Sequence, residues 1–295
     1  MKYGPLVFLA AFLALSASWC GFVLTPQIQL GRAVQETNSV VTSEMYPQDR
    51  PGSARQGLEI YRAEGCAYCH SQQVEQKGTL VDVFLTDAGK NSMAVAAALT
   101  EQHLGTFSGP GLAAGLPKPV LRNASLDTAK ALANLLKKAG ANSQLRLVPF
   151  GPDIERGWGV RRTVAEDFIA DSHVMPGSQR VGPDLANVGM RLPDVNWQLM
   201  HLFAPRSVTK DSPMPSYPFL FERKKIGKQP SPDALQQLPK EFAPAEGYEI
   251  VPRPEAKALA AYLVSLRADV PLYEAPATPP PAATNAPAVT NAPAK

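Results

Sequence analysis

Cys66-Ala67-Tyr68-Cys69-His70 is the stretch of this 295-residue chain that decides its fold. The C-x-x-C-H spacing is the attachment signature of a c-type haem. Two thiols that add to the two vinyl groups of one porphyrin must lie about one helical turn apart, and the next residue then places an imidazole under the iron. The pentapeptide therefore predicts one covalent haem c, attached through Cys66 and Cys69, with His70 as an axial ligand of the iron.

Other uses of a C-x-x-C pair fit this chain less well. A zinc site needs a second pair of Cys or His ligands. The only other cysteine is Cys20, and the remaining histidines, His103, His173 and His201, do not have the spacing of such a pair. A thioredoxin-like pair lies near a βαβ pattern, and none is visible around Cys66.

The amino-terminal region is a candidate membrane span. Residues 4–24 are apolar, and no charged residue occurs between Lys2 and Arg32. This length crosses a bilayer as one helix. A cleaved signal peptide is the alternative, but the stretch is longer than a typical signal core and no Ala-x-Ala-like site closes it. Lipid attachment at Cys20 fits poorly because the bulky Trp19 precedes it.

We expect this span to be an uncleaved anchor in the bacterial inner membrane. Lys2 is the only charge before it, which favours a cytoplasmic amino terminus. The rest of the chain would then lie on the periplasmic side, where covalent c-type haem is attached. The formal net charge of +3 is too small to indicate a nucleic-acid partner.

Composition divides the chain into four parts. We predict an anchor over residues 1–24, a polar linker over 25–52, a soluble domain over 53–273 and a tail over 274–295. The tail consists largely of Pro, Ala, Thr and Asn. It is predicted to be disordered because it has no apolar surface to offset the entropy lost on ordering.

Two amphipathic helices are expected at the ends of the soluble domain, over residues 54–65 and 255–267. Gly57 in the first would admit another backbone, and Pro254 suits the start of the second. Their apolar stripes are Ala54, Leu58 and Tyr61 in the first, and Leu259, Tyr262, Leu263 and Leu266 in the second. One helix leads into C-x-x-C-H, so the pair resembles the class I cytochrome c fold, in which the terminal helices cross at glycine and aromatic residues. The predicted fold is mainly α.

Two further motifs resemble those of class I cytochromes. Gly182-Pro183-Asp184-Leu185 is similar to the G-P-x-L loop, which alone would be only a turn. The resemblance implies that the Pro183 carbonyl accepts a hydrogen bond from the proximal imidazole. Met214, followed by Pro215-Ser216-Tyr217, resembles the distal-ligand motif and is implied as the second axial ligand. Met175, in Val174-Met175-Pro176-Gly177, and the three other histidines remain alternatives.

Taken together, the motifs look like those of the mono-haem subunit II of cbb3-type cytochrome c oxidases. They comprise Cys66–His70 with Ser71-Gln72-Gln73-Val74, and the segments 156–159, 161–167, 177–180, 182–189, 201–202, 205–206 and 214–218. The resemblance implies a membrane-anchored cytochrome with no catalytic residues of its own. Its partners would be the haem–copper catalytic subunit, where oxygen is reduced, and the other cytochrome c subunits of the complex.

One segment departs from this family pattern. Residues 78–149 form a longer loop than the family leads us to expect, with a predicted helix over 127–139 between Ser125 as a cap and Gly140 as a stop. Two other functions stay open. A nitric oxide reductase has an anchored mono-haem subunit of the same plan, although Gln72-Gln73-Val74 and residues 156–167 favour the oxidase. A catalytic or ligand-binding haem with an open sixth position would bind carbon monoxide when reduced.

Overall fold

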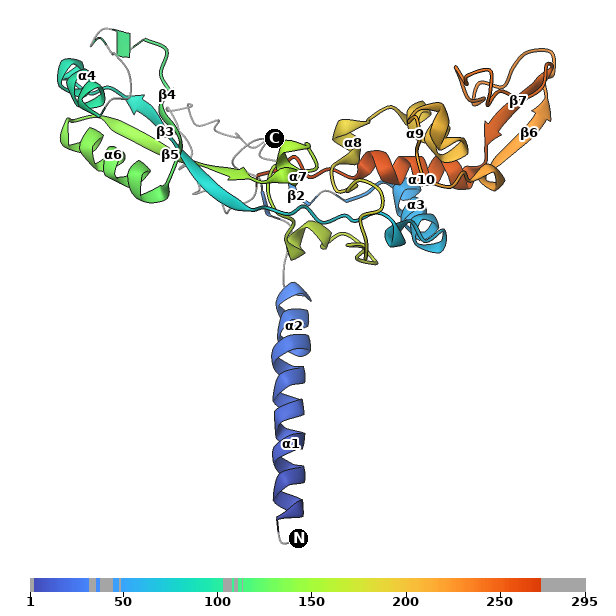
Figure 1. Ribbon diagram of the computed structural model, residues 1–295, viewed down its shortest axis with the longest axis horizontal. Helices are drawn as coiled ribbons and strands as arrows, with labels where there is room; N and C mark the ends of the chain where they lie inside the picture. The colour runs from blue at the N-terminus through green and yellow to red at the C-terminus, as the bar shows by residue number, and fades with distance from the viewer. Residues whose placement is uncertain are drawn as a thin grey trace, which may run out of the picture.

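Figure 1 shows the chain as a computed structural model. The structure describes residues 3–31, 36–37, 45–47, 49–102, 108, 111–112 and 114–271. The described residues form an amino-terminal helix, a helical domain that contains the C-x-x-C-H motif, and a lobe of strands and helices. The predicted tail over 274–295 lies outside the described residues.

The amino-terminal helix is one continuous run. It consists of α1 (Gly4–Trp19), one π-helical turn η1 (Cys20–Leu24) and α2 (Thr25–Gly31). Residues Gly4–Gln29 have a mean hydropathy of 2.2, and none of the most apolar window is buried against the rest of the chain. By length and composition this helix can cross a membrane. It continues beyond Leu24, where we expected the linker to begin.

Residues between the amino-terminal helix and the helical domain form polar contacts with that domain. The Tyr46 hydroxyl donates a hydrogen bond to Asp167 at 2.8 Å. Arg50 forms an ion pair of 2.6 Å with Asp171, and its guanidinium lies 5.3 Å from the ring centre of Tyr262. The short strands β1 (Glu36–Thr37) and β2 (Met45–Tyr46) pair here in antiparallel register. The end of the predicted linker therefore contacts the domain through residues that include Tyr46 and Arg50.

The helical domain is built around two helices from its two ends, α3 (Gly52–Ala63) and α10 (Pro254–Ser265). A side chain at Gly57 would place its Cβ 2.0 Å from the Ala258 carbonyl oxygen, so only glycine allows this approach. One turn later, the rings of Tyr61 and Tyr262 meet with their centres 5.3 Å apart. The predicted contact of a glycine with another backbone, beside aromatic residues, is thus confirmed.

Shorter elements complete this domain and enclose the space beside α3 and α10. They are η2 (Cys66–Tyr68), α7 (Pro152–Glu155), η3 (Ala165–Phe168), α8 (Val188–Arg191), α9 (Val195–Phe203), η4 (Pro205–Ser207), η5 (Pro218–Leu220), β6 (Phe221–Lys225) and β7 (Tyr248–Pro252). Strands β6 and β7 pair as an antiparallel hairpin. The buried core of the domain includes Leu58, Leu199, Leu202, Leu259 and Leu263.

Residues 78–149, expected as a long inserted loop with one helix, fold together with Phe150 as a lobe with its own core. The order β4-β3-β5 makes a three-stranded antiparallel sheet. The elements are β3 (Gly78–Asp87), α4 (Ser92–Glu101), β4 (Lys118–Ala124), α6 (Leu126–Lys138) and β5 (Asn142–Phe150). Val81, Val83 and Leu85 alternate along β3 and pack under the helices. The described residues therefore contain both helices and sheets, and the three-stranded sheet of the lobe was not predicted.

The lobe is joined to the helical domain by a stalk of two strands. β3 and β5 pair over their whole lengths, from Gly78 opposite Phe150 to Asp87 opposite Asn142. In Figure 1 this ribbon runs from the helical domain to α4 and α6 at the far end of the lobe. Among the described residues, the buried cores of lobe and domain have no member in common.

Candidate haem site

The C-x-x-C-H motif forms one tight turn directly after α3. The amide of Cys69 donates to the Cys66 carbonyl at 3.1 Å, and the amide of His70 donates to the same oxygen at 3.0 Å. Both cysteines are free thiols, with Cys66 half-buried and Cys69 exposed. Burial raises the pKa of the Cys66 thiol to about 12. The turn therefore holds two thiols and an imidazole within five residues, as attachment of one porphyrin requires.

The His70 ring is held by the predicted proline. Its Nδ1 lies 2.8 Å from the Pro183 carbonyl oxygen. A carbonyl can only accept, so Nδ1 carries the proton and Nε2 keeps the lone pair that binds a metal. Burial lowers the pKa of His70, which keeps the ring neutral, as a ligand must be. Gly182 packs against the same ring, because a Cβ there would lie 2.3 Å from His70 Cε1.

The loop that carries Pro183 lies along the C-x-x-C-H turn and is fixed to it by backbone hydrogen bonds. These bonds come from both segments and do not depend on side-chain identity. The donor and acceptor pairs are Ser178 to Ala67 at 3.0 Å, Gly182 to Cys69 at 2.9 Å, Gln72 to Pro176 at 2.9 Å and Leu185 to Ser71 at 2.8 Å. Two segments more than 100 positions apart thus form one wall of the site.

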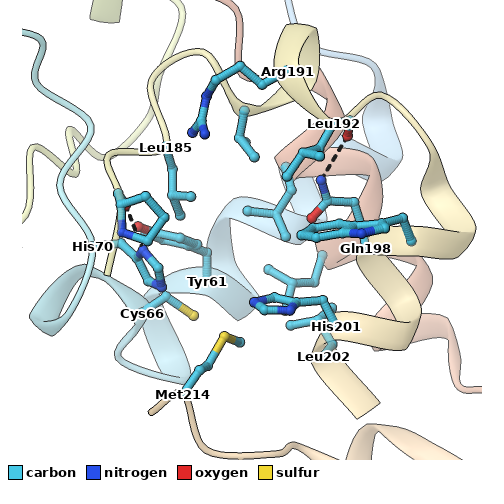
Figure 2. A pocket seen from close by; sticks show the side chains of 15 residues that line it. Tyr61, Cys66, His70, Leu185, Arg191, Leu192, Gln198, His201, Leu202 and Met214 are labelled. Atoms are coloured by element: carbon cyan, nitrogen blue, oxygen red, sulfur yellow. Dashed lines mark hydrogen bonds between the residues drawn. The ribbon is translucent and has the colours of Figure 1, made fainter. Parts of the chain in front are cut away.

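A cavity opens on the other side of the His70 ring. It offers about 570 Å³ of space outside protein atoms, part of it open to solvent. Figure 2 shows Cys66 and His70 on one side of this space and Met214 and His201 below it. The remaining wall is largely apolar and includes Leu185, Val188, Leu192, Leu202, Leu259 and Leu263.

Three buried polar atoms of the residues that line the cavity have no hydrogen-bond partner among the described residues: the Tyr61 hydroxyl oxygen, Arg191 Nε and His201 Nδ1. Buried polar groups without a partner are costly, so such atoms point to a ligand. The His201 ring stacks on Trp197, and burial lowers the pKa of His201 to about 4. Haem fits this donor set: thiols for its vinyl groups, an imidazole and a thioether for its iron, and a guanidinium for its carboxylates.

The structure sorts the predicted candidates for the sixth iron ligand. Met214 and His201 both line the cavity, whereas Met175 packs against the domain core and is not part of the cavity wall. His173 lies elsewhere and contacts Glu59 at 3.1 Å. His103 lies outside the described residues. The structure thus brings Cys66, His70, Pro183 and Met214 together, with Cys69 on the exposed side of the same turn.

Sequence reasoning missed Arg191, and it kept His201 only as one of several alternatives. Both lie on short helices, α8 and α9, that pack against α10 only in the folded chain. The only sequence signal that could have indicated Arg191 is its position, since it is a charged residue shortly after the Gly182–Leu185 loop. The Arg191 guanidinium is also fixed in position by a hydrogen bond of 2.6 Å that it donates to the Asp184 carbonyl.

Comparison with known proteins supports the haem reading of this domain. The family model described as cytochrome c oxidase, mono-heme subunit/FixO, matches residues 142–238. This segment contains the loop that carries Pro183, the helices α8 and α9, and Met214. The match confirms the resemblance found in the sequence motifs.

A second similarity is of a different kind. The large ribosomal subunit protein bL12 of Corynebacterium aurimucosum is 39% identical to this chain over 74 residues, which is 24% of this chain. The chain spans 58% of the length of that relative. The length of the match is close to that of the lobe, residues 78–150.

Proposed function

We propose that this chain is a membrane-anchored c-type cytochrome, since residues 142–238 match the family model described as the mono-heme subunit of cytochrome c oxidase. It passes electrons to the haem–copper catalytic subunit of a cbb3-type oxidase. The observation that carries the proposal is the cavity that brings Met214 to Cys66 and His70 of the C-x-x-C-H turn, beside a hydrogen-bonded His70···Pro183 pair.

Each residue has a distinct task in this proposal. Cys66 and Cys69 hold one haem c covalently, and the bound haem supplies reversible one-electron chemistry at its iron. His70 presents Nε2 as the proximal ligand, with its ring oriented by Pro183. Met214 is the distal ligand, and a thioether there raises the reduction potential and closes the sixth position. The chain therefore does not reduce oxygen itself.

The anchor and the partners follow from the same reading. The helix Gly4–Gln29 spans the bacterial inner membrane once, with the haem domain on the periplasmic side. The partners are the catalytic subunit and the other cytochrome c subunits of the complex. The cytochrome domain covers residues 53–273, and its class I-like fold is supported by the contact of α3 with α10 at Gly57.

We assign the bL12 similarity to the lobe, residues 78–150. The lobe has a separate core and a length close to that of the matched segment. The cytochrome domain is then interrupted between Lys77 and Gly151 by an inserted domain.

The test is co-purification from mildly solubilised membranes, with haem staining of the separated subunits. We expect the chain to carry haem through denaturing electrophoresis and to bring a haem–copper subunit with it. Recovery of a nitric oxide reductase subunit instead would contradict the oxidase assignment.

Carbon monoxide added to the reduced protein tests the distal side. A six-coordinate iron with Met214 gives no fast carbon monoxide complex. Rapid and complete binding would show an open site and support a ligand-binding or catalytic haem.

A further inference from the structure

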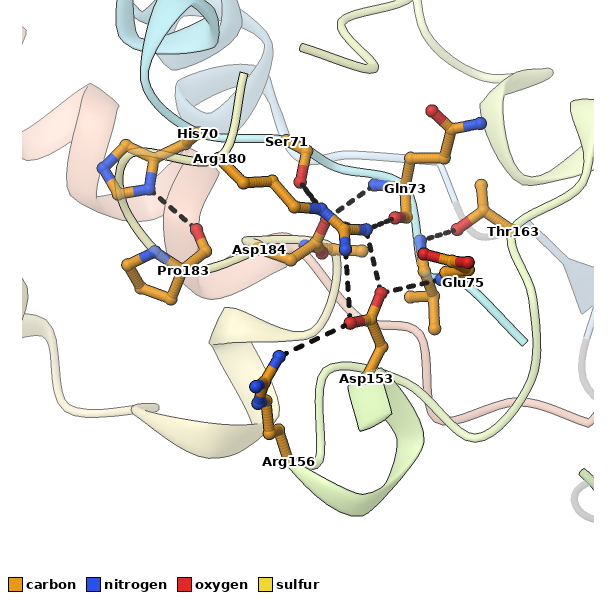
Figure 3. A network of polar contacts seen from close by, with 12 residues as sticks. His70, Ser71, Gln73, Glu75, Asp153, Arg156, Thr163, Arg180, Pro183 and Asp184 are labelled. Carbon is orange, nitrogen blue, oxygen red and sulfur yellow. Dashed lines mark hydrogen bonds and ion pairs between the residues drawn. The ribbon is translucent and has the colours of Figure 1, made fainter. Parts of the chain in front are cut away.

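Behind the His70 ring, away from the cavity, lies a polar network that the proposed function does not use (Figure 3). Its centre is Asp184, which is fully buried. One of its carboxylate oxygens accepts hydrogen bonds from the Ser71 hydroxyl at 2.6 Å and from the Gln73 amide at 2.8 Å. The other accepts from the Ala186 amide at 2.8 Å. A buried carboxylate is costly unless it is paired in this way.

The place of Asp184 in the chain gives this network its meaning. Asp184 directly follows Pro183, which accepts the hydrogen bond from the His70 ring, and Ser71 directly follows His70. The bond from Ser71 to Asp184 therefore joins the two segments that carry the donor and the acceptor of the His70···Pro183 bond. A change in the Ser71–Asp184 distance therefore also changes the His70···Pro183 distance, because Ser71 is bonded covalently to His70 and Asp184 to Pro183.

Arg180 ties the same hydroxyl to a second buried carboxylate. Its Nε donates to Ser71 Oγ at 2.8 Å, while its two terminal nitrogens lie 3.2 and 2.8 Å from the oxygens of Asp153. It also donates to the Gln73 carbonyl. Asp153 is 3% exposed. The planar guanidinium with its fixed donors suits this role, and a lysine could not make these contacts together.

A second arginine, Arg156, contacts Asp153 at the edge of the network. Arg156 lies 4.0 Å from Asp153, and its side chain is 60% exposed. Among the described residues, Arg156 forms no hydrogen bond or ion pair with Ser71 or with the loop that carries Pro183. Arg180, by contrast, is 33% exposed and also lies 3.7 Å from Asp184. The two arginines share a partner and differ in their tie to Ser71.

We propose that Arg180 and Asp184, acting through Ser71, are positioning residues that set the orientation and basicity of the His70 imidazole, and through them the reduction potential of the bound haem. This rests on the proposed haem function. A strong hydrogen bond from Nδ1 makes the ring a better donor to iron, which favours the oxidised state. Loosening the network weakens that bond, so the potential rises.

The test uses the purified full chain with its haem and compares substitutions that keep net charge. Ser71→Ala removes the hydroxyl that bonds both Asp184 and Arg180. Arg180→Lys keeps the positive charge but loses the planar guanidinium with its several donors. Arg156→Lys is the matched control. The measurements are the midpoint potential from an equilibrium redox titration and the electron paramagnetic resonance spectrum of the oxidised haem, which reports the axial ligand field.

We expect Ser71→Ala and Arg180→Lys to raise the midpoint potential and alter the resonance spectrum, and Arg156→Lys to change neither. Parent values in both haem-loaded variants would overturn the proposal, and so would an equal shift in Arg156→Lys. If Arg180→Lys fails to take up haem, Ser71→Ala decides alone, since it removes one oxygen atom. A parent chain without covalent haem would refute the proposed function itself, and haem staining before the titration separates that failure from this one.

Discussion

Gly182→Ala is the smallest change that reaches the proposed iron ligand. The added Cβ would lie 2.3 Å from Cε1 and 2.7 Å from Nδ1 of His70, where ordinary van der Waals contact begins at 3.4 Å. The backbone of Gly182 does not have a positive φ, so alanine can adopt the same conformation without strain. The effect of the substitution is therefore steric and is directed at one ring.

The size of the effect follows from these distances. The ring or the loop must retreat by about 1.1 Å to restore contact at 3.4 Å. A retreat of this size disrupts the His70···Pro183 bond, which is now 2.8 Å long. The hydrogen bond contributes about 1 kcal/mol, and we take this stabilisation to act on the oxidised haem only. Its loss then raises the midpoint potential by roughly 40 mV, because a tenfold change in a one-electron equilibrium corresponds to about 59 mV. Overpacking would destabilise the domain by about 1–3 kcal/mol.

The assay compares Gly182→Ala with Gly227→Ala by redox titration and by denaturant unfolding of the haem-loaded chain. Gly227 is a matched control because a Cβ there meets nothing within 4 Å and its φ is not positive. We expect the control to behave as the parent in both measurements. Equal potentials and equal stabilities for the two variants would refute the reasoning, because the ring would then not be in contact with the loop.

Three further predictions concern attachment, ligation and the lobe. Cys66→Ser or Cys69→Ser leaves at most one thioether bond, and the double variant loses all haem in denaturing electrophoresis; haem retained by the double variant would contradict covalent attachment. Met214→Ala lowers the midpoint potential and lets the reduced protein bind carbon monoxide. If the absorption spectrum of the haem is unchanged in this variant, another residue is the sixth ligand, and His201 is the first to test. Replacing residues 80–148 by Asn-Gly, a two-residue hairpin turn, leaves haem content and potential unchanged; loss of haem there would show that the domain needs the lobe.

The parts of the site that are local in sequence could be predicted from it. The C-x-x-C-H turn needs only neighbouring residues, and Gly57 with Tyr61 shows the contact face of α3 directly. The helix predicted over 54–65 is observed at Gly52–Ala63, and Ser125 caps α6 by accepting from the Thr128 amide at 3.2 Å, as expected. Each of these features depends on residues within about one or two helical turns of one another.

The parts that depend on distant pairing could not be predicted. Val81, Val83 and Leu85 show the alternation of a strand, but the partner of Val81 in β5 is Leu147, and no local signal identifies it. His201 and Arg191 are polar residues whose meaning depends on the apolar wall that surrounds them in the fold. The choice between Met214 and His201 as iron ligand is likewise set by loop geometry, which residue type alone does not determine.

The position of the stalk explains how the helical domain can carry the lobe without disturbing the candidate haem site. The two strands leave the domain at Lys77 and return at Gly151, where the Lys77 amide donates to the Phe150 carbonyl at 2.9 Å. Just inside this pair, the Glu75 amide donates to Asp153 at 2.8 Å, so the two ends of the insertion are already joined by the buried network behind His70. Residues that meet in the domain without the lobe impose little loop-closure cost on an insertion between them.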